Sequence, residues 1–278
     1  MTGGRGGNGL MHDGASSSGG AGGNAHVEYA TLTPAVVTNL NIVARGGRGG
    51  DAFSEFGGDG GAGGLATVDP LRLFSGVVNM HVRGGDGGHS MSGNAGSGRT
   101  IQLAPPTITN PGGLAQFTIT AQGGDGGSLL GSKTTYRESL RQSGDGGQGI
   151  VISEGKLPHL FQKDNVVRAI GGWAGRGIGP SGWGRAGDAI VRIRESISSA
   201  GSLSAIAEAG RSYQRTNGVS RATVDLQATE GVFGDITASA TARPDPGVNR
   251  TGPIPVANFG GSAYAESFAY RKDAQGLI

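Results

Sequence analysis

Short apolar segments recur along this chain, and most of them alternate apolar with polar side chains. They are LNIVA at 40–44, GVVNMHV at 76–82, LAQFTITA at 114–121, IVIS at 150–153, AIVRI at 189–193 and TVDLQA at 223–228. β-Branched and aromatic residues at every second position are typical of strands that bury one face. A helical pattern fits only two short segments, 203–209 and 134–142. The sequence therefore predicts a mainly β protein with almost no helix.

The apolar segments belong to a module of about 40 residues, which contains a strand, a turn, a second strand, a Gly-rich tract and a loop. First strands are predicted to start near Ala25, Ala66, Thr100, Gly149, Ala189, Ala222 and Ala263, and second strands to end near Arg45, Arg83, Gln122, Ile170, Ala209 and Arg243. These positions define six units and the opening strand of a seventh. Such a period indicates an elongated stack of strand pairs, in which each unit buries its apolar face against its neighbours.

Glycine supplies 58 of the 278 residues, and much of it follows a period of three. The second strands lead into ARGGRGGDAF (44–53), VRGGDGGHS (82–90) and AQGGDGGSL (121–129). A three-residue period is that of the polyproline II helix, which has no internal hydrogen bonds and must bond to its neighbours. Stacking one such tract per repeat would supply those neighbours, so a polyglycine II bundle is expected beside the strands. A flexible Gly-rich linker is the alternative.

The Gly content divides the chain into three parts. Residues 1–20 form a Gly-rich N-terminal tract, residues 21–187 hold the Gly-rich β/polyglycine II repeats, and residues 188–278 continue the same stack with little Gly. Of the 58 Gly, 48 lie within residues 1–187. The final units are therefore expected to be more ordinary β-structure.

The GGRGG and GGDGG tracts resemble those of polyglycine II bundle proteins, which include phage tail-fibre tip adhesins and the glycine-rich antifreeze proteins of springtails. The strand-plus-Gly module is also similar to the repeats of glycine-rich bacterial surface proteins. The resemblance covers roughly residues 20–190. It implies an adhesive or ice-binding role on an elongated scaffold.

Composition argues against several classes of protein. The chain contains no Cys, so it cannot be a disulfide scaffold, and no apolar run is long enough to span a membrane. Arg tracts alternate with Asp tracts and the net charge is +2, which does not favour nucleic-acid binding. The GxGxxG match at 177–182 lacks a βαβ context, the five His have no ligand-type spacing, and no enzyme is predicted.

The loops that follow the Gly tracts are not repetitive, and they carry many of the aromatic residues. All six loops occupy the same place in the repeat, so they should emerge on one face of the stack. The residues predicted to bind a receptor or ligand are Phe53, Phe56, Tyr136, Trp173, Trp183 and Tyr213. The alternative is that these rings fold back and cap the Gly layer.

Acidic residues also recur in the tracts. Asp59, Asp86, Asp125 and Asp145 share the motif Gly-Asp-Gly-Gly, and residues 46–54 around Asp51 match a calcium-binding nonapeptide once. If equivalent turns stack, the four carboxylates of the Gly-Asp-Gly-Gly motif would approach one another, and a calcium ion would neutralise them. Asp51 is a further candidate ligand through the nonapeptide match. The alternative is that each Asp accepts nearby backbone N–H groups or faces Arg45, Arg48 and Arg83. No cofactor is predicted other than this calcium.

These patterns predict a non-enzymatic structural or adhesive fibre component of a virion tail or cell surface. Expected partners are further copies of the chain and a receptor or glycan, with no nucleic acid and no membrane span. No signal-peptide pattern is visible, which favours a virion protein, an unconventionally exported protein or a fragment of a larger chain. The alternatives are an ice- or surface-binding protein and a calcium-binding repeat domain of a larger secreted protein.

Overall fold

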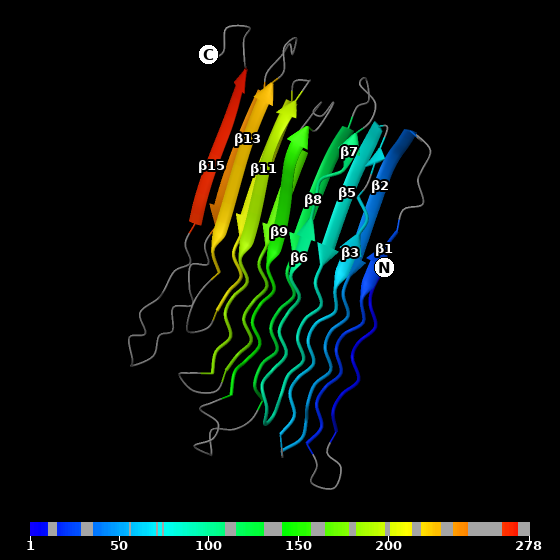
Figure 1. Cartoon of the computed structure of the whole chain (residues 1–278), viewed down its shortest axis with the longest axis vertical. Helices are drawn as coiled ribbons and strands as arrows, with labels where there is room; N and C mark the ends of the chain where they lie inside the picture. The colour runs from blue at the N-terminus through cyan, green and yellow to red at the C-terminus, as the bar shows by residue number, and fades with distance from the viewer. Residues whose placement is uncertain are drawn as a thin grey trace.

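The computed structural model describes residues 1–10, 16–28, 36–55, 57–70, 72–73, 75–108, 115–130, 141–156, 165–177, 182–197, 201–212, 218–228, 236–243 and 263–271. These residues form strands and extended Gly-rich tracts, stacked as a parallel β-solenoid (Figure 1). The predicted fold class is confirmed. The described part of the chain contains no helix that is long and apolar enough to cross a membrane.

Two parallel sheets hold the long strands. The six-stranded sheet has the order β14-β12-β10-β8-β5-β2 and the five-stranded sheet the order β15-β13-β11-β9-β6. The first contains β2 (Val36–Arg45), β5 (Ser75–Arg83), β8 (Ala115–Gln122), β10 (Asn165–Ile170), β12 (Gly201–Glu208) and β14 (Ile236–Arg243). The second contains β6 (Ile101–Leu103), β9 (Gly149–Lys156), β11 (Ala189–Ile197), β13 (Ser220–Ala228) and β15 (Ala263–Arg271).

Each strand pairs with its counterpart in the next unit, not with the other strand of its own unit. Ala189 of β11, for example, lies opposite Gly149 of β9 on one side and Ser220 of β13 on the other. From the third unit on, the first strand of a unit lies in the five-stranded sheet, and the second strand of every unit lies in the six-stranded sheet. The turn between them therefore connects two sheets, and the predicted strand pair is not a hairpin.

Short strands complete the first units. β1 (Ala25–Val27) pairs in parallel with β3 (Ala66–Val68), and Figure 1 places both next to β6 in the order of the units. β4 (Arg72–Leu73) pairs in parallel with β7 (Thr107–Ile108).

The core lies between the two sheets and is built from alternate residues of each strand. In the six-stranded sheet it includes Val78, Met80, Val82, Phe117, Ile119 and Val167, and in the five-stranded sheet Ile101, Val151, Val191, Ile193 and Val224. Burial of each such side chain contributes about 2 kcal/mol, which makes this alternation the main source of sheet stability.

The helical alternative for residues 203–209 is wrong. Leu203, Ala205 and Ala207 point into the core from strand β12, and each is at most 1% exposed. The parallel ladders with β10 and β14 hold this segment extended, so tertiary pairing overrides the helix propensity of Leu and Ala. The other segment, 134–142, lies outside the described residues except for 141 and 142.

Glycine tracts continue the strands and form two further layers at the lower end of Figure 1. The outgoing layer follows the six-stranded sheet and comprises residues 1–9, 45–53, 83–91, 122–130, 170–176 and 208–212. The returning layer leads into the five-stranded sheet and comprises residues 16–24, 57–65, 93–100, 142–148 and 182–188. Each of the first units thus contributes two tracts, one to each layer, and not the single tract predicted from the sequence.

Backbone hydrogen bonds join the tracts with a period of three residues. The first Gly of a Gly-Gly-x triplet donates within its layer, as Gly46 does to Arg83 O (3.0 Å) and Gly84 to Gln122 O (2.9 Å). The second Gly donates to the opposite layer, as Gly88 does to Gly61 and Gly127 to Gly96, both at 2.8 Å. All of these bonds join different tracts, which is the bonding expected of a polyglycine II bundle.

Candidate functional site

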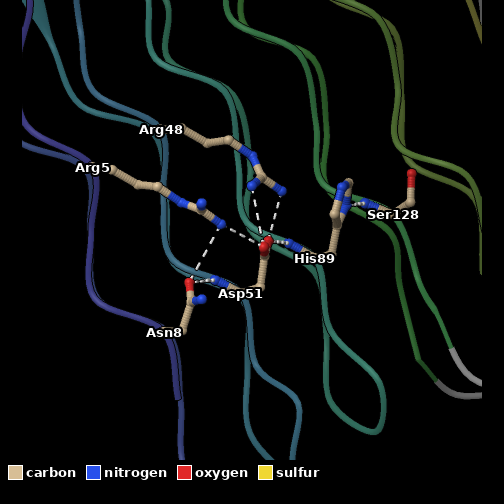
Figure 2. Close-up of polar contacts among 6 residues, drawn as sticks. All are labelled: Arg5, Asn8, Arg48, Asp51, His89 and Ser128. Atoms are coloured by element: carbon tan, nitrogen blue, oxygen red, sulfur yellow. Dashed lines mark hydrogen bonds and ion pairs between the residues drawn. The ribbon is translucent and has the colours of Figure 1, made fainter. Parts of the chain in front are cut away.

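The third residue of a Gly-Gly-x triplet carries a side chain, and in several of the described tracts that side chain accepts a backbone N–H of the next tract. In the outgoing layer the N–H of Asp51 donates to Asn8 Oδ1 (3.1 Å), that of His89 to Asp51 Oδ1 (2.7 Å), and that of Ser128 to His89 Nδ1 (2.8 Å) (Figure 2). Each acceptor side chain belongs to one tract and each donor N–H to the next tract of the same layer. We call this row Asn8–Asp51–His89–Ser128 the acceptor ladder.

Asp51 is the member of the acceptor ladder that binds charged side chains. Its carboxylate accepts two hydrogen bonds from Arg48, at 2.6 and 3.1 Å, and one from Arg5 at 2.7 Å. Asp51 is 5% exposed, so these contacts lie largely away from water. Burial raises the pKa of the Asp51 carboxyl, but the hydrogen bond from the His89 N–H and the contacts with Arg48 outweigh it, and the pKa lies below its usual value. The carboxylate therefore stays ionised and holds three tracts together.

His89 must be neutral to keep its place in the ladder, because its Nδ1 atom accepts a hydrogen bond from the Ser128 N–H. Burial and the positive charge of Arg48 lower the pKa of His89 below its usual value, against the opposing effect of Asp51. The folded state thus binds a proton at His89 less readily than the unfolded chain does.

This difference predicts a loss of stability in acid. The contribution of His89 is fully present above pH 6.5 and is lost as the pH falls through its lowered folded pKa. The variant His89→Asn keeps an acceptor, as Asn8 and Asn94 already provide one for the tracts that follow them. Between pH 7.5 and 5 the native protein should lose about 1 kcal/mol more unfolding free energy than His89→Asn, measured by urea titration. Equal losses in the two proteins would contradict the role of neutral His89.

The other four acidic residues accept backbone N–H groups in the same way. In the outgoing layer Asp86 accepts from the Asp125 N–H (2.9 Å) and Asp125 from the Trp173 N–H (2.7 Å), and Arg83 lies 2.8 and 2.9 Å from the two carboxylates. In the returning layer Asp59 accepts from the Asn94 N–H and Asp145 from the Arg185 N–H, both at 2.7 Å.

The five acidic residues are thus divided between two layers, and only Asp86 and Asp125 follow one another in the same row. Among the described residues there is no group of three or more His, Asp or Glu side chains arranged to hold a metal ion. The bonds to backbone N–H groups explain why Asp recurs in the tracts, and calcium binding stays a prediction.

The predicted aromatic residues lie in different environments. Trp173 is 46% exposed, and the guanidinium of Arg211 lies 5.1 Å from its ring centroid. Phe53 is 37% exposed, whereas Trp183 is only 9% exposed. Phe56, Tyr136 and Tyr213 lie outside the described residues. Two of the described rings therefore face solvent and the third packs against the protein.

An exposed apolar row crosses the outgoing layer at the end farthest from the sheets. Isolated parallel bridges connect Gly9, Ala52, Ser90 and Leu129 from tract to tract. The residues that directly follow these four are Leu10, Phe53, Met91 and Leu130. Leu10 is 65% and Leu130 47% exposed, and Met91 is partly exposed. We call these four residues the apolar row.

Backbone bonds fix the spacing of the apolar row. The N–H of Phe53 donates to Gly9 O (3.0 Å), that of Met91 to Ala52 O (3.0 Å) and that of Leu130 to Ser90 O (2.8 Å). The side chains of the apolar row thus extend from a backbone that is held by hydrogen bonds. A rigid backbone of this kind gives a binding surface a defined geometry.

Sequence reasoning found Phe53 but missed Leu10, Met91 and Leu130. The signal was present in the alignment of four octapeptides, GGRGGNGL (3–10), GGRGGDAF (46–53), GGDGGHSM (84–91) and GGDGGSLL (123–130), each of which ends on a large apolar residue. It was overlooked because only aromatic residues were considered at the loop positions.

Comparisons with known proteins leave the family of this chain open. No protein-family model and no curated protein matches it. Among solved structures, a springtail antifreeze protein from Granisotoma rainieri, described as a nine polyproline type II helical bundle, is 22% identical over 66% of this chain and 89% of that protein, with a TM-score of 0.14. This score is too low to carry an argument about fold or function.

Proposed function

We propose that this chain is a non-enzymatic adhesive component of a virion tail or cell surface, which contacts a receptor or glycan through the apolar row. The stacked-repeat fold is compatible with a structural or adhesive protein. The observation that carries the proposal is the row Leu10, Phe53, Met91 and Leu130, in which large apolar side chains are exposed, or for Met91 partly exposed, on successive tracts. Contiguous exposed apolar residues on a rigid support are typical of interaction sites.

The surroundings of the apolar row support this role. The acceptor ladder lies two residues before the apolar row, on the side toward the sheets, and its one charged member, Asp51, is bound by Arg48 and Arg5. Trp173 and Arg211, on later tracts of the same layer, add an exposed aromatic ring and a cation. A surface that combines apolar side chains, an aromatic ring and Arg fits receptors with both apolar and polar groups.

Attachment assays with labelled protein test this proposal. The probes are a panel of immobilised glycans and a panel of intact bacterial cells. We expect binding to at least one probe, and at least a tenfold loss of that binding in the variant Phe53→Ser/Met91→Ser/Leu130→Ser with no change in melting temperature. The matched control, Val43→Ser/Phe268→Ser, removes exposed apolar side chains from the strands and should bind normally. Unchanged binding by the row variant, or no binding by the native protein, would count against the proposal.

The two alternative functions have direct tests as well. A thermal-hysteresis measurement tests ice binding, and a calorimetric titration with calcium tests the calcium-binding repeat.

A further inference from the structure

Among the described residues, the regular bonding between glycine tracts stops at the first tract. The end face at this tract is formed by residues 1–9 of the outgoing layer and residues 16–24 of the returning layer. The N–H groups of Gly20 and Gly23 donate to Gly7 O and Gly4 O, both at 2.7 Å, and so bond the second tract to the first. No described tract lies on the other side of residues 1–9.

Backbone donors on this face have no acceptors in the part of the chain that the structure describes. The second Gly of a triplet in later tracts donates to the tract before it, as Gly47 does to Gly23 and Gly61 to Gly50. Gly4 and Gly7 occupy the same triplet position, but their N–H groups have no acceptor among the described residues, and both glycines are exposed. A Cβ atom placed on either would meet no atom within 4 Å.

Backbone acceptors are left over on the same face. In the next outgoing tract the carbonyl groups of Arg45 and Arg48 accept from Gly3 (2.8 Å) and Gly6 (2.9 Å). The corresponding carbonyl groups of Thr2, Arg5, Ser18 and Ala21 have no donor among the described residues. Since a polyproline II helix rises about 3.1 Å per residue, the free groups repeat roughly every 9 Å along the tract.

We propose that this end face binds the same face of a second copy of the chain and forms a closed dimer. A partner for the free groups must itself have Gly at two positions of each triplet, because a Cβ in an interior tract would lie about 2 Å from a carbonyl oxygen, as at Gly50 (2.0 Å from Gly7 O). The end face of a second copy meets this requirement and offers both donors and acceptors. It is thus complementary to itself, as a twofold interface requires.

Both relative directions of two tracts already occur within the bundle. Neighbouring tracts of one layer run parallel, and tracts of opposite layers run in opposite directions, because the chain goes out through one layer and returns through the other. The second copy can therefore dock whichever direction its tracts take. The last outgoing tract that the structure describes in full, Glu208-Ala209-Gly210-Arg211, does not offer such a surface, because it lacks Gly at two positions of a triplet and its Gly210 is buried.

This dimer is independent of the receptor proposed for the apolar row, and analytical ultracentrifugation tests it. We expect the full chain to dimerise and Gly4→Val/Gly7→Val to weaken dimerisation at least tenfold, with an unchanged melting temperature because both Cβ positions are open. The control Thr237→Val/Ser239→Val, on exposed positions of β14, should dimerise like the native chain. A monomeric native chain at millimolar concentration, or an undiminished dimer in Gly4→Val/Gly7→Val, would overturn the proposal.

A second measurement covers the case in which the variant is unstable. In the native chain, the amide hydrogens of Gly4 and Gly7 should exchange with solvent at least tenfold more slowly in concentrated than in dilute solution. Rates that do not depend on concentration would also overturn the proposal.

Discussion

Replacing Gly88 with Ala should lower the unfolding free energy by about 3 kcal/mol or more, whereas replacing Gly7 with Ala should leave it nearly unchanged. A Cβ at Gly88 would lie 1.9 Å from Gly50 O and 3.0 Å from the amide nitrogen of Gly61. Both contacts are with backbone, so no side-chain rotation relieves them. The bond from the Gly88 N–H to Gly61 O (2.8 Å) would be displaced as well.

Gly7 is the matched control because it occupies the same triplet position in the first outgoing tract. A Cβ there would meet nothing within 4 Å. The two variants are compared by urea titration at a concentration at which the chain is monomeric. Equal stability of Gly88→Ala and Gly7→Ala would mean that the tracts are not packed as described.

Asp51→Ala should destabilise the protein by about 2 kcal/mol, because it removes a largely buried carboxylate that accepts several hydrogen bonds, most of them from charged donors. The substitution removes the acceptor of Arg48 (2.6 Å), Arg5 (2.7 Å) and the His89 N–H (2.7 Å) at once. The measurement is again the unfolding free energy. The loss of unfolding free energy should be nearly the same at high as at low salt concentration, since Asp51 is largely buried and salt screens buried charges little.

Asp59→Ala provides the comparison for Asp51. Asp59 is exposed and accepts one hydrogen bond, from the Asn94 N–H, so its loss should cost about 1 kcal/mol. Asp51→Asn should fall between the two variants, because an amide oxygen still accepts the His89 N–H but does not neutralise Arg48. A loss at Asp51 no larger than that at Asp59 would show that the Arg contacts contribute nothing.

The repeat and its strands could be predicted from the sequence to a large extent. Strand β8 was expected to end at Gln122 and β10 at Ile170, and the structure ends them there. These strand ends could be predicted because apolar residues alternate inside the strands and the Gly-Gly-x tracts begin directly after them. Two local periods, of two and of three residues, thus mark the boundary.

The arrangement of the units in two sheets was harder to predict from the sequence. The pattern of a strand, a turn and a strand does not reveal that the two strands enter different sheets, because hairpins and solenoid turns share it. The returning tracts were also underestimated, since NAGSG (94–98) and GWGRAG (182–187) keep the three-residue period less strictly than GGDGG does. Their Gly residues nevertheless form the same hydrogen bonds between tracts. The Gly96 N–H, for example, donates to Gly88 O (2.8 Å).

The candidate site was predicted only in part, for a physical reason. Large apolar residues at tract ends and acidic residues at the third triplet position have meaning only once the tracts are in register. The register places Asp51 beside the His89 N–H, 38 residues away in the sequence, and Phe53 between Leu10 and Met91. A single tract does not contain that information, and only the alignment of the four octapeptides with one another reveals it for the apolar row.

Native-state hydrogen exchange of the tract glycines tests the central claim of a hydrogen-bonded polyglycine II bundle most directly. On dilute protein, the amides of Gly85, Gly88, Gly124 and Gly127 should be protected as strongly as those of strands β5 and β8, because each donates to a carbonyl group of the opposite layer or the adjoining tract at 2.8 or 2.9 Å. The amides of Gly4 and Gly7 should exchange at the rate of an unfolded chain. Unprotected exchange at all of these glycines, beside protected strands, would show that the tracts are flexible linkers and would contradict the account.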